Sequence, residues 1–348
     1  MNRHGHLIGA AFFLVVFLAA CGSPAPTPVA ATPPPPKPPS DQERLQKYQD
    51  CWGYFNDKKF DQLKDCYDAS ATSQQMGYGK GGTASGPDAI VSASQDLAKA
   101  APDVRGDAQL ILVNGNHVAS VYLMKGTNSA PMTGADGKEI PATNKKFGLM
   151  FGHVVEFAPD ALKAVTETGV MDSATFASQL GLSKQRARAA LETGVASPEI
   201  VIAKNDATEK ANIEAESVQI TAWNKHDSAA EQALIADNSV FHDFTAAKDY
   251  NKKQGEQMNA GYWKAFSDAR IVPHAVWAAG DYLVLTGNFE GTNDGANPAM
   301  GLKKATNKQV VVPFVEIDKI VAGKNQESWL FFDSAQFATQ LGLTTGKK

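Results

Sequence analysis

The chain has 348 residues, of which 43% are hydrophobic and 20% are charged, with 33 basic residues against 37 acidic ones. This composition excludes disordered, collagen-like and multi-span membrane proteins, and the length suffices for two globular domains. A net charge of −4, with no long run of Lys or Arg, makes nucleic acid an unexpected partner.

The first twenty residues have the pattern of an export signal. Arg3 precedes an apolar run over residues 7–20, which is shorter than the roughly 18 to 20 residues of a spanning helix. The end of this run, residues 18–23, resembles the lipobox of bacterial lipoproteins, in which the cysteine is acylated after the preceding peptide is removed. The resemblance implies an exported lipoprotein that is held on a membrane by lipid on Cys21. In a Gram-negative cell we expect the periplasmic face of the outer membrane. The alternative is an ordinary signal peptide with a cysteine near its end.

Residues 21–41 form a spacer. The stretch consists mainly of Pro, Ala and Thr and includes four consecutive prolines, 33–36. Such a composition favours an extended polyproline II conformation and cannot bury a core.

The rest of the chain contains one sequence pattern twice. Residues 172–182 recur as 333–343 with nine of eleven positions identical. Further matches precede them in the same order, and they pair 126–128 with 291–293, 142–145 with 305–308, and 155–157 with 315–317. We predict one domain at 42–182, a linker at 183–206 and a second domain at 207–343.

Within the second copy, hydrophobic periodicity predicts a helix over 209–225 and then a short helix. Strands follow at 239–244, 270–278, 281–290, 309–317 and 327–332. In both copies a final short helix is expected, with Asp172 or Asp333 at its N-cap and Gly181 or Gly342 after its end. Helices followed by strands predict an α+β fold with an antiparallel sheet.

These residues resemble the SnoaL-like polyketide cyclases of the nuclear transport factor 2 superfamily. The resemblance rests on 222–224, Asp268, Gly280, 291–292, 306–308 and 340–343. It implies two tandem cone-shaped domains, each a curved antiparallel sheet packed on about three helices around an apolar pocket. The superfamily contains cyclases, isomerases and non-enzymatic binders, so the fold leaves the activity open.

Acid–base chemistry in such a cone needs an ionisable group inside an apolar wall. His242 and Glu316 are the candidate catalytic residues. Candidate pocket residues are Trp223, Tyr262, Trp263, His274, Trp277 and Trp329 in the second copy and Tyr122, His153 and Glu156 in the first. The alternative for each is a core, surface or locally hydrogen-bonded role, because strand alternation does not tell which face lines the cone.

If Cys21 is acylated, Cys51 and Cys66 are the two remaining cysteines of the chain. The sequence is equally consistent with a disulfide between them and with two buried free thiols. The histidines are scattered and no Cys pair has zinc spacing, so we expect neither a metal nor a cofactor. Residues 79–83 are expected to form a glycine-rich loop at a pocket mouth.

The sequence thus favours an envelope lipoprotein that binds a small apolar or amphipathic molecule. One alternative is a cyclase or isomerase that uses His242 or Glu316. Another is a non-catalytic scaffold for envelope proteins, in which the two domains form an intramolecular pseudodimer.

Overall fold

The computed structural model describes residues 37–77, 82–133, 139–184 and 187–343, which all belong to one compact unit, Lys37–Lys348. The predicted signal peptide, Cys21, most of the spacer and residues 79–81 of the glycine-rich loop lie outside the described residues. None of the described helices combines the length and the hydropathy needed to cross a bilayer.

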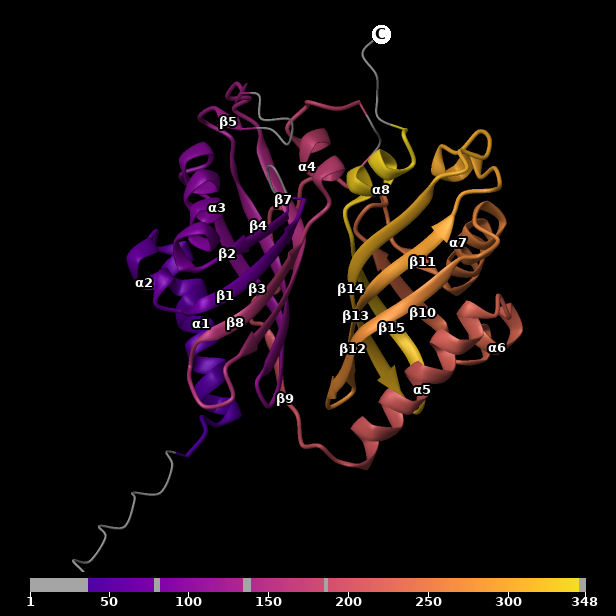
Figure 1. Ribbon diagram of the computed structural model, residues 1–348, viewed down its shortest axis with the longest axis horizontal. Coiled ribbons are helices and arrows are strands. Elements are labelled where there is room, and N and C mark those ends of the chain that lie inside the picture. Colours follow the sequence, from indigo (N-terminus) through magenta and orange to yellow (C-terminus); the bar gives the residue numbers. More distant parts are fainter. Residues whose placement is uncertain (1–36, 78–81, 134–138, 185–186, 344–348) are drawn as a thin grey trace, which may run out of the picture. The chain divides into compact units, whose positions relative to one another are not determined.

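The first copy of the repeat packs helices against one face of a curved sheet (Figure 1). Its helices are α1 (Asp41–Asn56), α2 (Phe60–Lys64), α3 (Pro87–Ala100) and α4 (Ser173–Gln179). Its strands are β1 (Tyr67–Met76), β2 (Gly82–Ser85), β3 (Arg105–Asn114), β4 (His117–Thr127), β5 (Met132–Thr133), β6 (Glu139–Ile140), β7 (Lys146–Phe157) and β8 (Ala164–Val170).

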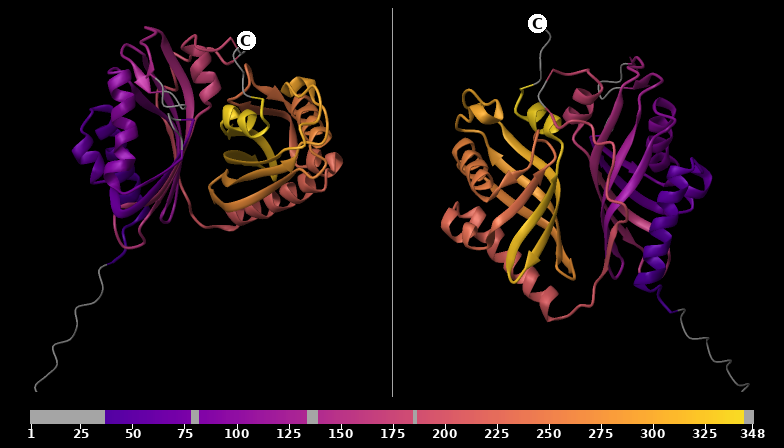
Figure 2. Two further views of the ribbon diagram at one scale, coloured as in Figure 1. Left: turned by 45° about the horizontal axis from the view of Figure 1, so that its top comes forward. Right: turned by 180° about the vertical axis from the view of Figure 1, so that it is seen from behind.

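The second copy repeats this order except that a short 3₁₀ helix takes the place of β5 and β6, and Figure 2 shows its sheet from two further directions. Its helices are α5 (Ala207–Asn224), α6 (Ser228–Ala233), α7 (Lys252–Ala265), a short 3₁₀ helix (Pro298–Met300) and α8 (Ser334–Gln340). Its strands are β10 (Ile235–Asp243), β11 (Tyr250–Asn251), β12 (Arg270–Ala279), β13 (Tyr282–Thr292), β14 (Gln309–Val321) and β15 (Lys324–Phe331).

The strand order is β2-β1-β8-β7-β4-β3-β9 in the first sheet and β11-β10-β15-β14-β13-β12 in the second. This arrangement confirms the predicted fold of two tandem α+β domains. The sheets are not purely antiparallel, however, because β1 pairs with β8 in parallel and β10 pairs with β15 in parallel. Strand β9 (Glu199–Ile202) lies in the segment predicted as a linker and extends the first sheet beside β3.

The last helix of each domain begins and ends as its sequence predicts. Asp172 accepts a hydrogen bond from the backbone of Thr175, and Asp333 accepts one from that of Ala335. Gly181 and Gly342 follow the helices with φ of 73° and 70°, a left-handed conformation that glycine adopts without strain.

The two capping aspartates also bond to each other's helix. Asp172 Oδ1 accepts from the backbone N–H and hydroxyl of Ser334, at 2.9 and 2.6 Å. Asp333 Oδ1 accepts from the same two groups of Ser173, at 3.1 and 2.6 Å. Each carboxylate therefore accepts hydrogen bonds from the N-termini of both α4 and α8.

The described residues form three apolar clusters. Two lie inside the individual domains, between sheet and helices. The third takes residues from both sheets, and in it Phe331 of β15 packs against the backbone of Gly152 in β7, where an added Cβ would lie 2.7 Å from the ring. Each sheet therefore has a helix-covered face, which can enclose a pocket, and an opposite face that contributes to this shared cluster.

Candidate functional site

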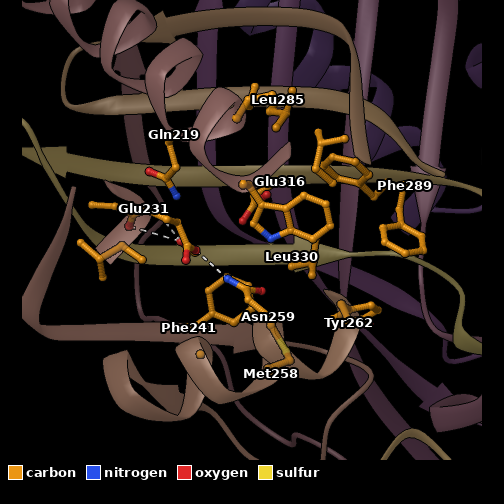
Figure 3. A pocket seen from close by; sticks show the side chains of 18 of the residues that line it. Gln219, Glu231, Phe241, Met258, Asn259, Tyr262, Leu285, Phe289, Glu316 and Leu330 are labelled. Atoms are coloured by element: carbon orange, nitrogen blue, oxygen red, sulfur yellow. Dashed lines mark hydrogen bonds between the residues drawn. The ribbon is translucent and has the colours of Figure 1, made fainter. Parts of the chain in front are cut away.

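The second domain encloses a cavity of about 150 Å³ between its sheet and α5, α6 and α7. Most of the lining is apolar or aromatic, and Figure 3 shows Phe241, Leu285 and Phe289 around the carboxyl groups of Glu231 and Glu316. Asn259 donates to Glu231 Oε1 at 2.6 Å. The pocket therefore combines an apolar wall with a few acidic groups, a common composition for small-molecule sites.

The acidic groups come from three elements. Glu216 on α5, Glu231 on α6 and Glu316 on β14 line the cavity. Asp318 lies two residues beyond Glu316 on the same face of β14 and is not part of the lining. Asp318 accepts from Ser328 at 2.5 Å and from Asn325 at 2.9 Å. By contrast, Glu216 Oε2 is buried without a hydrogen-bond partner, and Glu316 makes no side-chain hydrogen bond among the described residues.

Burial and mutual repulsion change the ionisation of these groups. Burial, with the charge of Asp318 as the second cause, raises the pKa of Glu216 to about 8. Burial and the charges of Asp318 and Glu216 raise the pKa of Glu316 well above its usual range. Burial also raises the pKa of Asp318, to about 6, against the hydrogen bonds from Ser328 and Asn325. Protonated and ionised carboxyls can therefore coexist here near neutral pH.

Glu216 is buried because α5 turns a polar face toward the sheet. Glu209, Asn212 and Glu216 are all less than 5% exposed and recur at helical spacing, whereas Val218, which an apolar stripe would bury, is 56% exposed. Sequence analysis missed Glu216, Glu231 and Asp318, and the spacing of Glu209, Asn212 and Glu216 was the pattern that could have revealed the first of them.

Only some of the residues predicted for the second pocket line the cavity. Trp223, Tyr262 and Glu316 line the cavity. Trp263 does not line it but packs beside it against Trp223 and His226, and His274 is exposed on β12. Trp277 and Trp329 belong to the cluster shared by the two sheets.

His242 lies outside the cavity lining as well. Its ring stacks on Phe244 and Trp329, and its two nitrogens each lie 3.0 Å from a carboxylate oxygen, of Asp249 and of Glu327. Arg188 also pairs with Asp249, at 2.8 Å. The imidazole is therefore fully engaged on the opposite side of the sheet from Glu316, so His242 and Glu316 do not form one site.

The first domain has a smaller cavity of about 80 Å³, and a complete hydrogen-bond network borders it. The Tyr48 hydroxyl is hydrogen-bonded to Ser120 and to His153 Nδ1, the latter at 2.8 Å, while His153 Nε2 lies 3.3 Å from Glu167 Oε2. Tyr67 donates to the same oxygen at 2.5 Å. Burial opposes the charge of Glu167, but the bonds from His153 and Tyr67 lower its pKa. Sequence analysis missed Tyr48, Tyr67 and Glu167.

Of the residues predicted for the first pocket, only His153 lines the cavity. Tyr122 is buried in the core, stacked on Trp52 with ring centroids 3.8 Å apart. Glu156 points away from the cavity, like its neighbour Val154, and accepts from Asn116. Cys51 and Cys66, whose Cα atoms lie 6.1 Å apart, form a disulfide beside the cavity.

The pairing register corrects one match between the copies. Gly126 pairs with Phe147, and its repeat equivalent Gly291 pairs with Val310. Counting six residues onward in each strand makes His153, rather than Glu156, the equivalent of Glu316. The repeated Val-Glu dipeptide had suggested the match at Glu156, but a strand's position is fixed by its partners.

In the part of the chain that the structure describes, no group of three or more His, Cys, Asp or Glu side chains could hold a metal ion.

Comparison with known proteins finds the same family for both domains. The family model for the SnoaL-like polyketide cyclases matches residues 42–180 and again residues 214–341. Similar solved structures include AclR from Streptomyces galilaeus, with 18% identity over 40% of this chain and 86% of AclR and a TM-score of 0.36. A SnoaL-like protein from Jannaschia sp. CCS1 matches with 18% identity over 40% of this chain and 96% of its own, with a TM-score of 0.35.

IdmH from Streptomyces antibioticus matches with 18% identity over 38% of this chain and 98% of IdmH, with a TM-score of 0.34. No curated protein matches the chain. Since the family model covers well over half of the sequence, in two successive regions, the chain belongs to the SnoaL-like polyketide cyclase family and carries two copies of its domain.

Proposed function

We propose that the second domain binds a small, mostly apolar molecule, which its acidic groups contact from inside the pocket. The observation that carries the proposal is the contrast between the two cavities. In the first domain every polar group of the Tyr48, His153 and Glu167 network has a partner. In the second, Glu216 is 4% exposed and still lacks a partner for Oε2. Because a buried unpaired group destabilises the free protein, a bound ligand is the natural partner.

The cavity volume limits the ligand's size. A cavity of about 150 Å³ accommodates a molecule about as large as benzene, so we expect a body of roughly six to ten non-hydrogen atoms. A longer molecule would have to extend from the pocket.

A pair of glycine substitutions tests this proposal. Gly255 lines the pocket from α7, and Gly53 lies on α1 outside either lining; a Cβ added at either position meets nothing within 4 Å. Gly255→Trp should therefore fill the pocket without disturbing the core, and Gly53→Trp is the matched control. We expect small neutral aromatics such as benzyl alcohol to bind the full-length protein and the control, measured by calorimetry, and not Gly255→Trp. Equal binding to both variants would contradict the proposal.

A second candidate function is proton transfer, as in a cyclase or isomerase. It is favoured by the raised pKa values of two lining residues, Glu216 at about 8 and Glu316, and by the neighbouring Asp318, whose pKa is about 6. A protonated carboxyl can donate to a ligand carbonyl while an ionised neighbour accepts a proton from the adjacent carbon. Glu316 lines the pocket and is the group we propose for contact with the ligand.

Hydrogen–deuterium exchange tests the second function without a known substrate. In D₂O the protein should speed exchange of the α-hydrogens of cyclohexanone, followed by NMR, and Glu316→Gln should remove this acceleration. His242→Gln should leave it intact, since His242 does not line the cavity. Exchange at the buffer rate with the wild-type protein would leave binding as the function.

We also propose that lipid on Cys21 anchors the chain at a membrane of the cell envelope. The lipobox-like residues 18–23 support this, and acyl chains contribute about 0.8 kcal/mol per buried CH₂. Cys21→Ser should lose the acyl mass and leave the membrane fraction. An unchanged mass and fractionation would refute the anchor.

The contacts between the two sheets support a further proposal, that the domains act as an intramolecular pseudodimer. Phe331, Trp277 and Trp329 are occupied in the shared cluster, so these faces are not free surfaces for other envelope proteins.

A further inference from the structure

The two domains carry different chemistry at equivalent positions of their pockets. The side chains of Asn56 and Asn224 make the same pair of hydrogen bonds, to the backbone of β3 and of β12. Tyr48 lies eight residues before Asn56 on α1, and Glu216 lies eight residues before Asn224 on α5. These two residues therefore occupy the same place above their sheets.

Two more positions follow from the strands. His153 corresponds to Glu316 by the pairing register. Glu167 lies five residues before the capping Asp172, and Ser328 lies five before Asp333. A hydroxyl, an imidazole and one carboxylate in the first domain are thus replaced by two carboxyls and a hydroxyl in the second.

This replacement leaves acceptors without donors. In the second domain the hydroxyl of Ser328 and the amide of Asn325 donate hydrogen bonds to Asp318, and the amide of Asn259 donates one to Glu231. Lys252, on the pocket rim, donates to Asp237 and to the carbonyl of Ile235. Among the described residues no donor bonds to Glu216 or Glu316.

We propose that the ligand of the second pocket is a small organic cation, a protonated primary amine on an apolar body, whose ammonium group lies between Glu216 and Glu316. This inference rests on the binding function proposed above and names its ligand class. An ammonium group offers three donors and no acceptor, which complements oxygens that lack donors. The nearby faces of Trp223, Tyr262 and Phe289 suit the apolar body and add cation–π attraction.

Binding of such a cation displaces protons from the pocket. The titratable groups around it are Glu216 on α5, Glu231 on α6, Lys252 and Tyr262 on α7, Asp243 on β10, and Glu316 and Asp318 on β14. In the free protein burial keeps Glu216 and Glu316 largely protonated near neutral pH. An arriving ammonium ion keeps its own protons and favours the carboxylate, so a carboxyl proton passes to the buffer.

Benzylamine and benzyl alcohol are matched probes, since they differ in the cationic group alone. With the full-length protein near neutral pH, we expect benzylamine to bind at least about tenfold more tightly, which is about 1.4 kcal/mol. Calorimetry in two buffers of different ionisation enthalpy should show about one proton released per benzylamine and none per benzyl alcohol.

Variants locate the effect. Glu316→Gln and Glu216→Gln should each weaken benzylamine binding by about tenfold or more and change benzyl alcohol binding little. Glu214→Gln, at an exposed position on the same helix, is the control and should change neither. Both test variants replace a carboxyl that is largely protonated in the free protein with a neutral amide of nearly the same shape, so we expect them to fold, with circular dichroism as the check.

The outcomes separate the two proposals. Benzyl alcohol binding that equals or exceeds benzylamine binding overturns the cation and leaves the pocket function standing. Benzylamine binding that is insensitive to both glutamate substitutions, or that releases no protons, also overturns it. If neither probe binds, both proposals fail.

Discussion

Replacing Asp172 with alanine tests the reciprocal capping of α4 and α8. The Asp172 side chain is 3% exposed and accepts four hydrogen bonds. Two come from Thr175 in its own helix, at 2.9 and 2.6 Å, and two from Ser334 at the start of α8, at 2.9 and 2.6 Å. Asp172→Ala removes all four.

The expected loss of stability follows from these bonds. Loss of an N-cap costs about 1 kcal/mol. Hydrogen bonds to a charged acceptor contribute about 1.5 kcal/mol or more each. Loss of the two bonds that Ser334 donates to Asp172 also leaves the backbone N–H of Ser334 without a partner. After partial hydration of the exposed groups, we expect the free energy of unfolding to fall by about 3 kcal/mol.

Urea unfolding of the full-length protein, followed by tryptophan fluorescence, measures this loss. Trp52 reports on the first domain, and the other four tryptophans lie in the second. Asp227→Ala is the control, because Asp227 is an exposed N-cap that accepts one backbone hydrogen bond, from Ala230 of its own helix. This control should cost about 1 kcal/mol.

A double-mutant cycle with Ser334→Ala isolates the bond from the Ser334 hydroxyl to Asp172, and we expect a coupling of about 1 kcal/mol. Two results would refute the reasoning. One is a loss for Asp172→Ala no larger than that of the control, and the other is a coupling indistinguishable from zero.

Three further predictions concern pH and the disulfide. The raised pKa of Glu216 means that the folded protein keeps a proton which the unfolded chain loses, so stability should fall as pH rises from about 4.5 to about 8. Urea midpoints across this range should show the fall, and Glu216→Gln should make it smaller, while the raised pKa values of Glu316 and Asp318 maintain the rest. Burial opposes the charge on His242, but the hydrogen bonds that its ring donates to Glu327 and Asp249, together with their negative charges, outweigh burial and raise the pKa of His242. The resulting stabilisation should be complete below about pH 6.5 and disappear as pH rises through the folded-state value; NMR titration that finds a lowered pKa would contradict this. The Cys51–Cys66 disulfide closes a loop over a sequence separation of 15, so Cys51→Ser with Cys66→Ser should reduce the free energy of unfolding by about 3 kcal/mol, whereas a change below about 1 kcal/mol would show that the crosslink constrains little.

Local patterns in the sequence predicted most of the helices and strands of the second domain, but they did not predict the two parallel strand pairs or β9. The predicted strand at 270–278 is β12 (Arg270–Ala279), and the predicted helix at 209–225 is α5 (Ala207–Asn224). The caps at Asp172 and Asp333 were predictable because an N-cap depends on residues within one turn. That each aspartate also reaches the other helix was not predictable, since residues about 160 positions apart make those bonds.

The site was predicted less well, because strand alternation defines two faces without saying which one is enclosed. Glu316 was correctly paired with Phe314 on one face, and both line the cavity. His242 was placed with Phe244, and they do share a face, but it is the face opposite the cavity. Glu216 was missed because a glutamate on a helix is usually solvated, and only packing of α5 against the sheet buries it.

The replacement of His153 by Glu316 shows what duplication within one chain permits. In an assembly of two identical subunits, every substitution appears twice, and an unpaired buried carboxyl would destabilise both pockets at once. Here each copy can change alone. The first copy keeps a network in which every polar group is paired, and it is bonded to the second through Ser173 and Ser334. One half of the chain can thus contain a fully paired polar network, while the unpaired carboxyls of the other half destabilise one domain and not two.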